Sequence, residues 1–310
     1  MATLYEEIVD AMGELHGVHP GYRAAHAKGS FCRGTFTAAP EARELTRAAH
    51  MQGDPVEVTV RFSNGSGDPK APDADRRDGR GMATQFHLSG GRETDIVAIT
   101  IPVFFVRTAD DFLDFLRARK PDPESGEMDI EKVGAFVAAH PETQAALELI
   151  LPSLVPPASY ATCAYNGLHA FGFTNAAGER RFGRYRWEPE AGSQMLSDER
   201  IESAPPSYLQ EELAERLDAG PVRFALGVKL AEGDDPLDDP TVPWPDDRPT
   251  IALGTMELAE LYPDAEADGV MVFDPTKVTD GIECSEDEIL ATRPHAYSVS
   301  AERRSRAARE

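Results

Sequence analysis

The chain has 310 residues, enough for one large hydrophobic core or two ordinary domains. Its 54 acidic side chains outnumber the 31 basic ones and give a formal net charge of −23, which argues against nucleic acid or an anionic membrane as partner. A solvated acidic surface explains the same excess. The three cysteines are far apart, the N-terminus has no apolar signal segment, and no run approaches the roughly 18 apolar residues of a membrane span. We therefore expect a cytoplasmic globular protein.

The first third of the chain predicts a helix followed by extended segments. Leu4, Ile8 and Met12 recur at helical spacing, which predicts a helix over 4–15. Glycine, aspartate, proline and arginine accumulate over 64–81, which predicts a loop. Strands are expected on both sides of this loop, from apolar–polar alternation or from a nearly continuous apolar run, at 30–36, 56–63, 82–88 and 95–106.

Helices and strands follow in blocks through the rest of the chain. Helical periodicity predicts helices over 109–119 and 130–150, the second interrupted by Pro141 and closed by Pro152. Further expected elements are strands at 159–174, 181–187 and 222–230, a hairpin loop at 175–178, a helix over 206–218, an exposed acidic loop over 231–248, and partly extended segments at 250–260 and 270–273. Strands around an inserted helical block predict a single α+β domain over residues 1–310, with an antiparallel sheet or barrel.

The C-terminal segment combines a tyrosine with an arginine four residues earlier. Ser285 to Glu288 form a capping box, which predicts a helix, and Pro294 is also suited to a first helical position. In either case Arg293 lies one turn from Tyr297, where its charge would favour the phenolate. A phenolate could serve as an axial ligand of haem iron, whereas the same pair also fits an ordinary surface or core contact.

Two segments of the N-terminal half offer complementary groups. His26, in the stretch 22–29, could take a proton from a bound peroxide and return it to the departing oxygen. Ser63, at the end of a predicted strand, could orient that ring, and the neighbouring Arg61 could hold a carboxylate. A structural histidine and a solvated arginine are the plain alternatives.

Aromatic residues and a further histidine complete the candidate set. The stretch 102–107 and Phe112 hold aromatic side chains at a density that suits a dry wall around a flat ligand, although ordinary core packing explains it equally. His169 lies on a predicted strand, where it could support the tyrosine from behind or be a packed, hydrogen-bonded histidine.

Taken together and in this order, the segments resemble the haem catalase superfamily, and in particular its short branch of catalase-related peroxidases. The matching stretches lie between residues 20 and 304, at 23–29, 60–63, 77–81, 102–105, 167–171, 273–275, 281–283 and 293–297. The resemblance implies a catalase-like eight-stranded antiparallel β-barrel with surrounding helices, with haem b buried in the barrel. Tyrosine ligation of catalase haem is a known instance of this chemistry.

The resemblance also implies roles for individual residues. His26 would be the distal acid–base and Ser63 its partner, while Tyr297 would bind the iron with support from Arg293. The arginines expected at the haem propionates are Arg23, Arg61 and Arg304, and Phe112 would stack on the haem. His169 and Asp287 would form a relay on the tyrosine side. Ala25, usually a valine, and Asp78 would line the channel.

The departures from the family pattern bear on the activity. A full catalase has an asparagine just before the stretch that matches 102–105, whereas Ile99 stands there in this chain, followed by Thr100. Isoleucine cannot hydrogen-bond a peroxide, and loss of one well-placed donor costs about 2.7–4 kcal/mol where it has been measured, in oxyanion holes. The long N-terminal arm and the C-terminal helical or nucleotide-binding domain of large catalases are not found in the sequence.

These expectations define a haem peroxidase that reduces hydrogen peroxide or organic hydroperoxides with a small organic electron donor. The reaction would pass through a ferryl porphyrin-radical intermediate, and weak catalase activity would remain. The expected assembly is a homo-oligomer, here a dimer. A true small catalase is the main competing function. Three further functions stay open: rearrangement of fatty-acid hydroperoxides, which the retained His26 disfavours, a non-catalytic haem carrier or sensor, and a haem-free stress scaffold.

Overall fold

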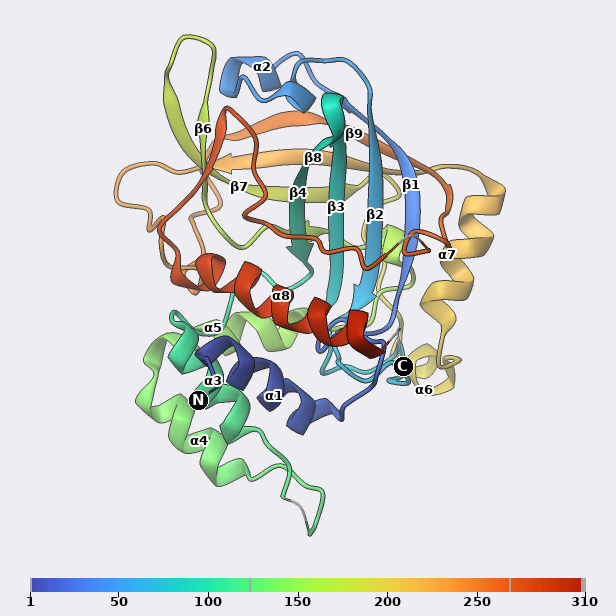
Figure 1. Ribbon diagram of the computed structural model, residues 1–310, viewed down its shortest axis with the longest axis vertical. Helices are drawn as coiled ribbons and strands as arrows, with labels where there is room; N and C mark the ends of the chain where they lie inside the picture. Colours follow the sequence, from blue (N-terminus) through green and yellow to red (C-terminus); the bar gives the residue numbers. More distant parts are fainter. Residues whose placement is uncertain (1, 123, 268, 308–310) are drawn as a thin grey trace.

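The computed structural model describes residues 2–122, 124–267 and 269–307. Its centre is an antiparallel barrel (Figure 1). The strands are β1 Gly29–Ala38, β2 Val56–Asn64, β3 Arg80–Leu88, β4 Arg92–Ile99, β5 Tyr165–Asn166, β6 Phe171–Thr174, β7 Arg180–Pro189, β8 Val222–Leu230, β9 Thr250–Leu261 and β10 Ile282–Cys284. The α-helices are α1 Leu4–His16, α2 Ala42–Leu45, α3 Ala109–Ala118, α4 Ile130–Ala139, α5 Pro141–Ser153, α6 Asp198–Ser203, α7 Tyr208–Ala219 and α8 Glu288–Ala307. Helices α1, α3, α4, α5 and α8 gather at one end of the barrel, whereas α2 lies at the other end and α7 at the side (Figure 1).

Eight strands close the barrel. Following the pairings, the order is β7-β5-β4-β3-β2-β1-β9-β8, and β8 pairs again with β7. Strands β6 and β10 extend the sheet from β7 outside this ring. Closure pairs the edges that an open sheet would expose, and it directs alternate side chains of each strand inward. The predicted eight-stranded antiparallel barrel is therefore confirmed.

The barrel interior is a continuous hydrophobic core. Phe62 of β2 stacks on Tyr160 and contacts Phe224 of β8, with ring centroids 5.5 and 5.9 Å apart. Trp187 of β7 is fully buried and meets Phe36 of β1 edge to face. Because these rings come from strands far apart in the sequence, burying them fixes the register of the barrel.

Helix α8 lies between the barrel end and the helices α1, α3 and α4 (Figure 1). Helix α1 packs on α3 through Ile8 and Leu113, and Arg303 of α8 pairs with Asp10 of α1 at 2.8 Å. Ile289 of α8 joins a cluster with residues of α3 and α4. None of the described helices has the length and apolar content needed to cross a membrane.

Several sequence expectations were wrong in detail. The apolar run expected as a strand over 95–106 is extended only to Ile99. Beyond it, Pro102 has no N–H to donate and Phe104 N donates to Pro240 O, so 101–106 forms an irregular segment in which Ile101, Val103 and Val106 are buried. The expected strand 159–174 is broken into the turn Tyr160–Thr162 and the short strands β5 and β6. The segment 270–273 contains no strand.

The helical segments differ from expectation at prolines and caps. Pro141 separates α4 from α5 rather than merely interrupting one helix, and Pro152 lies inside the last turn of α5. Helix α8 begins at Glu288, so Pro294 lies within it and not at its first position. The expected capping box at Ser285 does not cap this helix, because the carboxylate of Asp287 accepts the hydrogen bond from Leu290 N at 3.1 Å.

Candidate active site

His26 is hydrogen-bonded to strand β2 at the barrel end. Its Nδ1 lies 3.0 Å from Ser63 Oγ, and its backbone N–H donates to Gly65 O at 3.0 Å. These contacts hold His26 at φ 56, which is uncommon for a residue other than glycine. Gly81 of β3 faces Ser63 across the ladder, and a Cβ there would lie 2.8 Å from Ser63 Oγ and 2.9 Å from His26 Nδ1. Glycine is therefore required behind this pair.

The electrostatic environment keeps His26 neutral. Burial, followed by the charges of Arg61, Arg293 and Arg23, lowers its pKa from 6.5 to about 3. Since the Ser63 hydroxyl engages Nδ1, Nε2 is left to exchange a proton with a bound molecule. Arginines from three separate segments of the chain thus act on this one ring.

Helix α8 presents Tyr297 together with its predicted arginine partner. Arg293 Nε donates to the Tyr297 phenol oxygen at 2.8 Å, and its guanidinium lies 5.5 Å from the ring centroid. One turn further, Ser300 Oγ accepts from Ala24 N at 3.3 Å. This bond joins α8 to the segment that holds His26, so the two predicted halves of the site lie at the same end of the barrel.

Arg23 and Arg61 flank Phe31 of β1, and Arg304 joins them through a shared glutamate. The guanidinium carbons of Arg23 and Arg61 each lie 5.6 Å from its ring centroid. Arg23 and Arg304 share the carboxylate of Glu266 at 2.7 and 3.1 Å. Although burial opposes it, these two arginines hold the pKa of Glu266 below its usual value. The cluster therefore has three cations and one anion.

Two nitrogen atoms of this cluster lack partners. Arg61 Nε and Arg304 Nε are buried without a hydrogen bond. Burial and the charge of Arg23 lower the pKa of Arg61 to about 9, and the carboxylate of Glu266 offsets this only in part. A ligand carrying carboxylates would satisfy both donors and the excess positive charge.

An aromatic group lies on the first turns of α3. Phe112 packs against Phe104 and Phe105, with ring centroids 5.7 and 5.8 Å apart. All three rings are only partly buried in the protein. They therefore offer aromatic surface to a flat ligand, and the stacking of Phe112 on such a ligand stays a prediction.

His169 and Asp287 form a buried pair beside Arg293. His169 Nδ1 lies 2.6 Å from Asp287 Oδ2, and both side chains are almost inaccessible. Burial lowers the pKa of His169, Asp287 opposes the shift, and Arg293 adds to it. Asp287 also caps α8, so the pair anchors the helix that carries Tyr297.

The remaining predicted residues lie around the His26 segment. Asp78 accepts from Ser66 N at 3.2 Å, and burial raises the pKa of its carboxyl to about 6. The side chain of Ile99 packs on Gly79, where an added Cβ would lie 3.3 Å from Ile99 Cδ1. Thr100 Oγ1 accepts from Arg80 N at 3.0 Å, so its hydroxyl binds the backbone. Ala25, next to His26, is partly buried.

Two residues that complete these contacts were not among the predicted site residues. Gly81 stands in one of the matching stretches, but only the register of β2 with β3 shows that it makes room for His26. Glu266 lies in an irregular segment and reaches Arg23 across 243 residues of sequence, so no local pattern indicates it.

The site fits a planar, anionic cofactor. Partly exposed aromatic rings offer flat surface, unpartnered arginine nitrogens offer positive charge, and the phenol oxygen of Tyr297 is of a type that can ligate a metal. Together with the closed antiparallel barrel, these groups suit the class of proteins that hold a metal macrocycle through a tyrosine ligand.

Comparison with known proteins places the chain within this class. The family model Catalase matches residues 17–308, so the chain belongs to the catalase family. It is 36% identical over 303 residues to the catalase-related peroxidase of Synechococcus elongatus, covering 97% of this chain and 88% of that protein. It is 40% identical over 300 residues to that of Mycolicibacterium paratuberculosis, covering 95% and 93%. Family membership implies haem binding and makes the chain an oxidoreductase that acts on peroxide.

Solved catalases share the fold. Catalase A from Saccharomyces cerevisiae superposes with a TM-score of 0.82 at 23% identity, covering 96% of this chain and 64% of that one. A bacterial catalase gives 0.80 at 24% identity, covering 96% and 60%. The chain therefore spans roughly three fifths of the length of these solved catalases.

Proposed function

We propose that this protein is a haem b peroxidase that reduces hydrogen peroxide or organic hydroperoxides with a small organic electron donor. The observation that carries the proposal is the neutral His26 ring, held by Ser63 with Nε2 left for a substrate proton. The match to catalase-related peroxidases over most of both chains supports the same function. The homodimer and the cytoplasmic location stay predictions.

The proposal assigns the cofactor contacts as follows. Tyr297 would hold the haem iron through its phenol oxygen, to which Arg293 donates. Arg61 and Arg304 would hold the haem propionates with their free donors, together with Arg23. Phe112 would stack on the macrocycle, and the His169–Asp287 pair fixes α8, the helix that carries Tyr297. When bound, haem supplies the redox-active iron at which peroxide is reduced.

The distal residues handle the proton. His26 Nε2 accepts the peroxide proton and returns it to the departing oxygen, while Ser63 keeps the ring in place. Because the pKa of His26 is lowered to about 3, the ring is available as a base at neutral pH. Ala25 and Asp78 lie on the approach to His26 in this proposal. The apolar Ile99 and the occupied hydroxyl of Thr100 give a second peroxide no donor, which favours an organic reductant.

Two substitutions test these assignments separately. His26→Ala should retain haem but lose about 10²–10⁴-fold of the peroxide consumption, the usual contribution of a positioned acid–base group. Tyr297→Phe should lose haem or bind it abnormally. His87→Ala, a histidine on the same barrel but hydrogen-bonded to Thr59, is the matched control and should change neither. A His26 variant with wild-type turnover would overturn the mechanism.

A further inference from the structure

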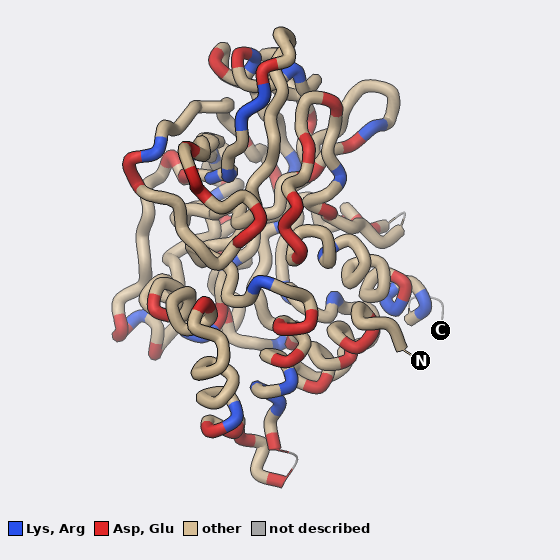
Figure 2. The backbone as a smooth tube through the Cα atoms, turned by 90° about the vertical axis from the view of Figure 1, so that its left-hand side faces the viewer, with Lys and Arg blue, Asp and Glu red and all other residues tan. Residues whose placement is uncertain are grey.

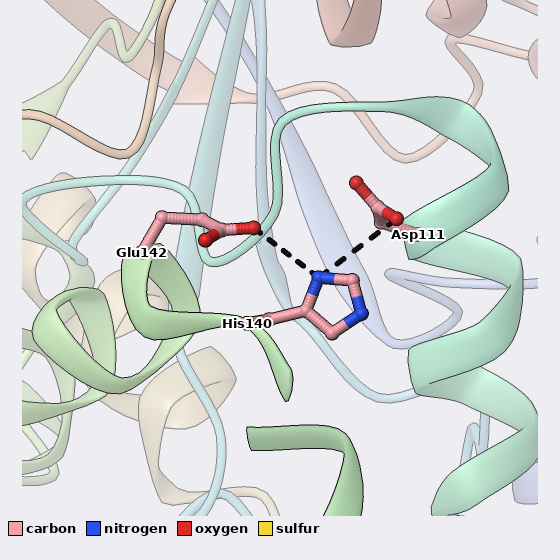
Figure 3. Close-up of side chains that lie close together, drawn as sticks. All are labelled: Asp111, His140 and Glu142. Carbon is pink, nitrogen blue, oxygen red and sulfur yellow. Dashed lines mark hydrogen bonds and ion pairs between the residues drawn. The ribbon is translucent and has the colours of Figure 1, made fainter. Parts of the chain in front are cut away.

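A second group of ligand-type side chains lies outside the proposed haem site. Asp111 in the first turn of α3, His140 at the junction of α4 and α5, and Glu142 in the first turn of α5 converge (Figure 3). His140 Nδ1 points between the two carboxylates, 3.2 Å from Glu142 Oε1 and 3.9 Å from Asp111 Oδ1. The chain between α3 and α5 therefore folds back, so that the side chains of Asp111, His140 and Glu142 lie close together.

The separations match those between ligands of one metal ion. The three ligand atoms all lie within 4.8 Å of one another. Bonds of about 2.0–2.2 Å in a tetrahedron put neighbouring ligand atoms about 3.4 Å apart, between the two measured histidine–carboxylate distances. The ring of His140 stacks on Phe136 with centroids 4.1 Å apart, which holds Nδ1 in this direction. Small side-chain adjustments would therefore complete the coordination.

The cluster borders a cavity of strongly negative character. A cavity of about 290 Å³ is lined by Asp111 and Glu142 and by the further carboxylates of Asp238, Glu286 and Glu288. The guanidinium in its lining, that of Arg107, is paired with Asp239 at 3.0 Å. Figure 2 shows acidic residues on many loops and helix ends of the molecule, but two of those that line this cavity, Asp111 and Glu142, adjoin a histidine. Neutral imidazole is a donor for transition ions, which a purely acidic surface patch does not offer.

We propose that Asp111, His140 and Glu142 bind one divalent transition-metal ion of the zinc type. The ion is held by one nitrogen and two carboxylate oxygens, and its fourth position faces the acidic cavity. Zinc accepts this mixed donor set, whereas magnesium prefers six oxygen ligands and retains its water. The site is separate from the residues assigned to haem.

The ion would act as a clip between helices. It joins α3 to the junction of α4 and α5 through side chains from both. The same α3 carries Phe112 next to Asp111, so the clip fixes the helix that supplies the aromatic surface of the haem site. The role of the ion in this proposal is structural.

Equilibrium dialysis of the haem-loaded protein against zinc chloride, followed by elemental mass spectrometry, tests the proposal. The method counts zinc and haem iron separately. Wild-type protein should bind one zinc per chain, and Asp111→Asn, His140→Ala and Glu142→Gln should each weaken binding at least tenfold. Asp110→Asn removes the same charge from the adjacent exposed position and should bind as wild type does. The iron content should be equal in all of them, which verifies that each variant is folded.

A second measurement follows thermal unfolding with increasing zinc. The midpoint should rise with zinc in the wild type and in Asp110→Asn but not in the three ligand variants, because an ion that binds only the folded chain stabilises it. The proposal is overturned if no stoichiometric zinc binds, if the ligand variants bind as tightly as the wild type, or if excess magnesium competes equally well. Each result would leave the three side chains as a cluster of ion pairs.

Discussion

Gly81→Ala should displace His26 and lower the activity, although the histidine itself is unchanged. A methyl group there would lie 2.8 Å from Ser63 Oγ and 2.9 Å from both Cε1 and Nδ1 of His26, whereas unstrained contacts are about 3.5–4.0 Å. The strand ladder holds Gly81 opposite Ser63, so the histidine must move. We expect about 1–3 kcal/mol of lost stability from overpacking. A displacement of about 1 Å at a reacting group costs about 10² in rate.

The assay is the initial rate of hydrogen peroxide loss with an organic donor, alongside haem content and urea unfolding. Gly134→Ala in α4 is the matched control, because no atom lies within 4 Å of the added methyl group, and its rate should equal that of the wild type. In a His26→Ala background, Gly81→Ala should cause no further loss of rate. A Gly81→Ala enzyme that turns over at the wild-type rate with normal haem content would refute the link between this close contact and the position of His26.

Three further predictions address charge, anchoring and specificity. Because the folded pKa of His26 is about 3 and its usual value 6.5, the unfolded chain gains a proton between these values that the folded chain does not. The free energy of unfolding that depends on the neutral ring is therefore complete above pH 6.5 and is lost as the pH falls toward 3. In urea unfolding, His26→Gln should lose less free energy of unfolding over this pH range than the wild type. An equal pH dependence in both proteins would contradict the lowered pKa of His26. Asp287→Ala leaves His169 and Leu290 N without their hydrogen-bond partner and should lower the free energy of unfolding by about 3–5 kcal/mol. A loss below about 1 kcal/mol would show that the buried pair does not anchor α8. Ile99→Asn supplies an amide donor and should raise oxygen evolution from hydrogen peroxide about tenfold or more at an oxygen electrode, and an unchanged rate would mean that position 99 does not contact peroxide.

The strands of the barrel were predictable where alternation is clean. The expected strand 56–63 appears as β2 Val56–Asn64, and 222–230 appears as β8. The apolar run 101–106 has the composition of a buried strand, but no periodicity reveals that Pro102 and a hydrogen bond from Phe104 to Pro240 take it out of the ladder. Burial alone does not specify strand geometry, so the prediction failed there.

The candidate site was predictable as residue types but not as contacts. The Arg293–Tyr297 bond follows from helical spacing, because one turn brings the two side chains together. The pairing of His26 with Ser63 depends on the loop that precedes β1, which the resemblance indicated and local patterns do not. Glu266 joins Arg23 and Arg304 only through the folded chain, which explains why sequence reasoning missed it.

The most direct test of the proposed function is the ultraviolet–visible spectrum of the purified, haem-loaded protein, followed through addition of hydrogen peroxide and then an organic reductant. We predict a high-spin ferric spectrum of a tyrosine-ligated haem that bleaches with peroxide and recovers only when the reductant is added. Vigorous oxygen evolution with immediate return to the starting spectrum would contradict this prediction and identify a true small catalase.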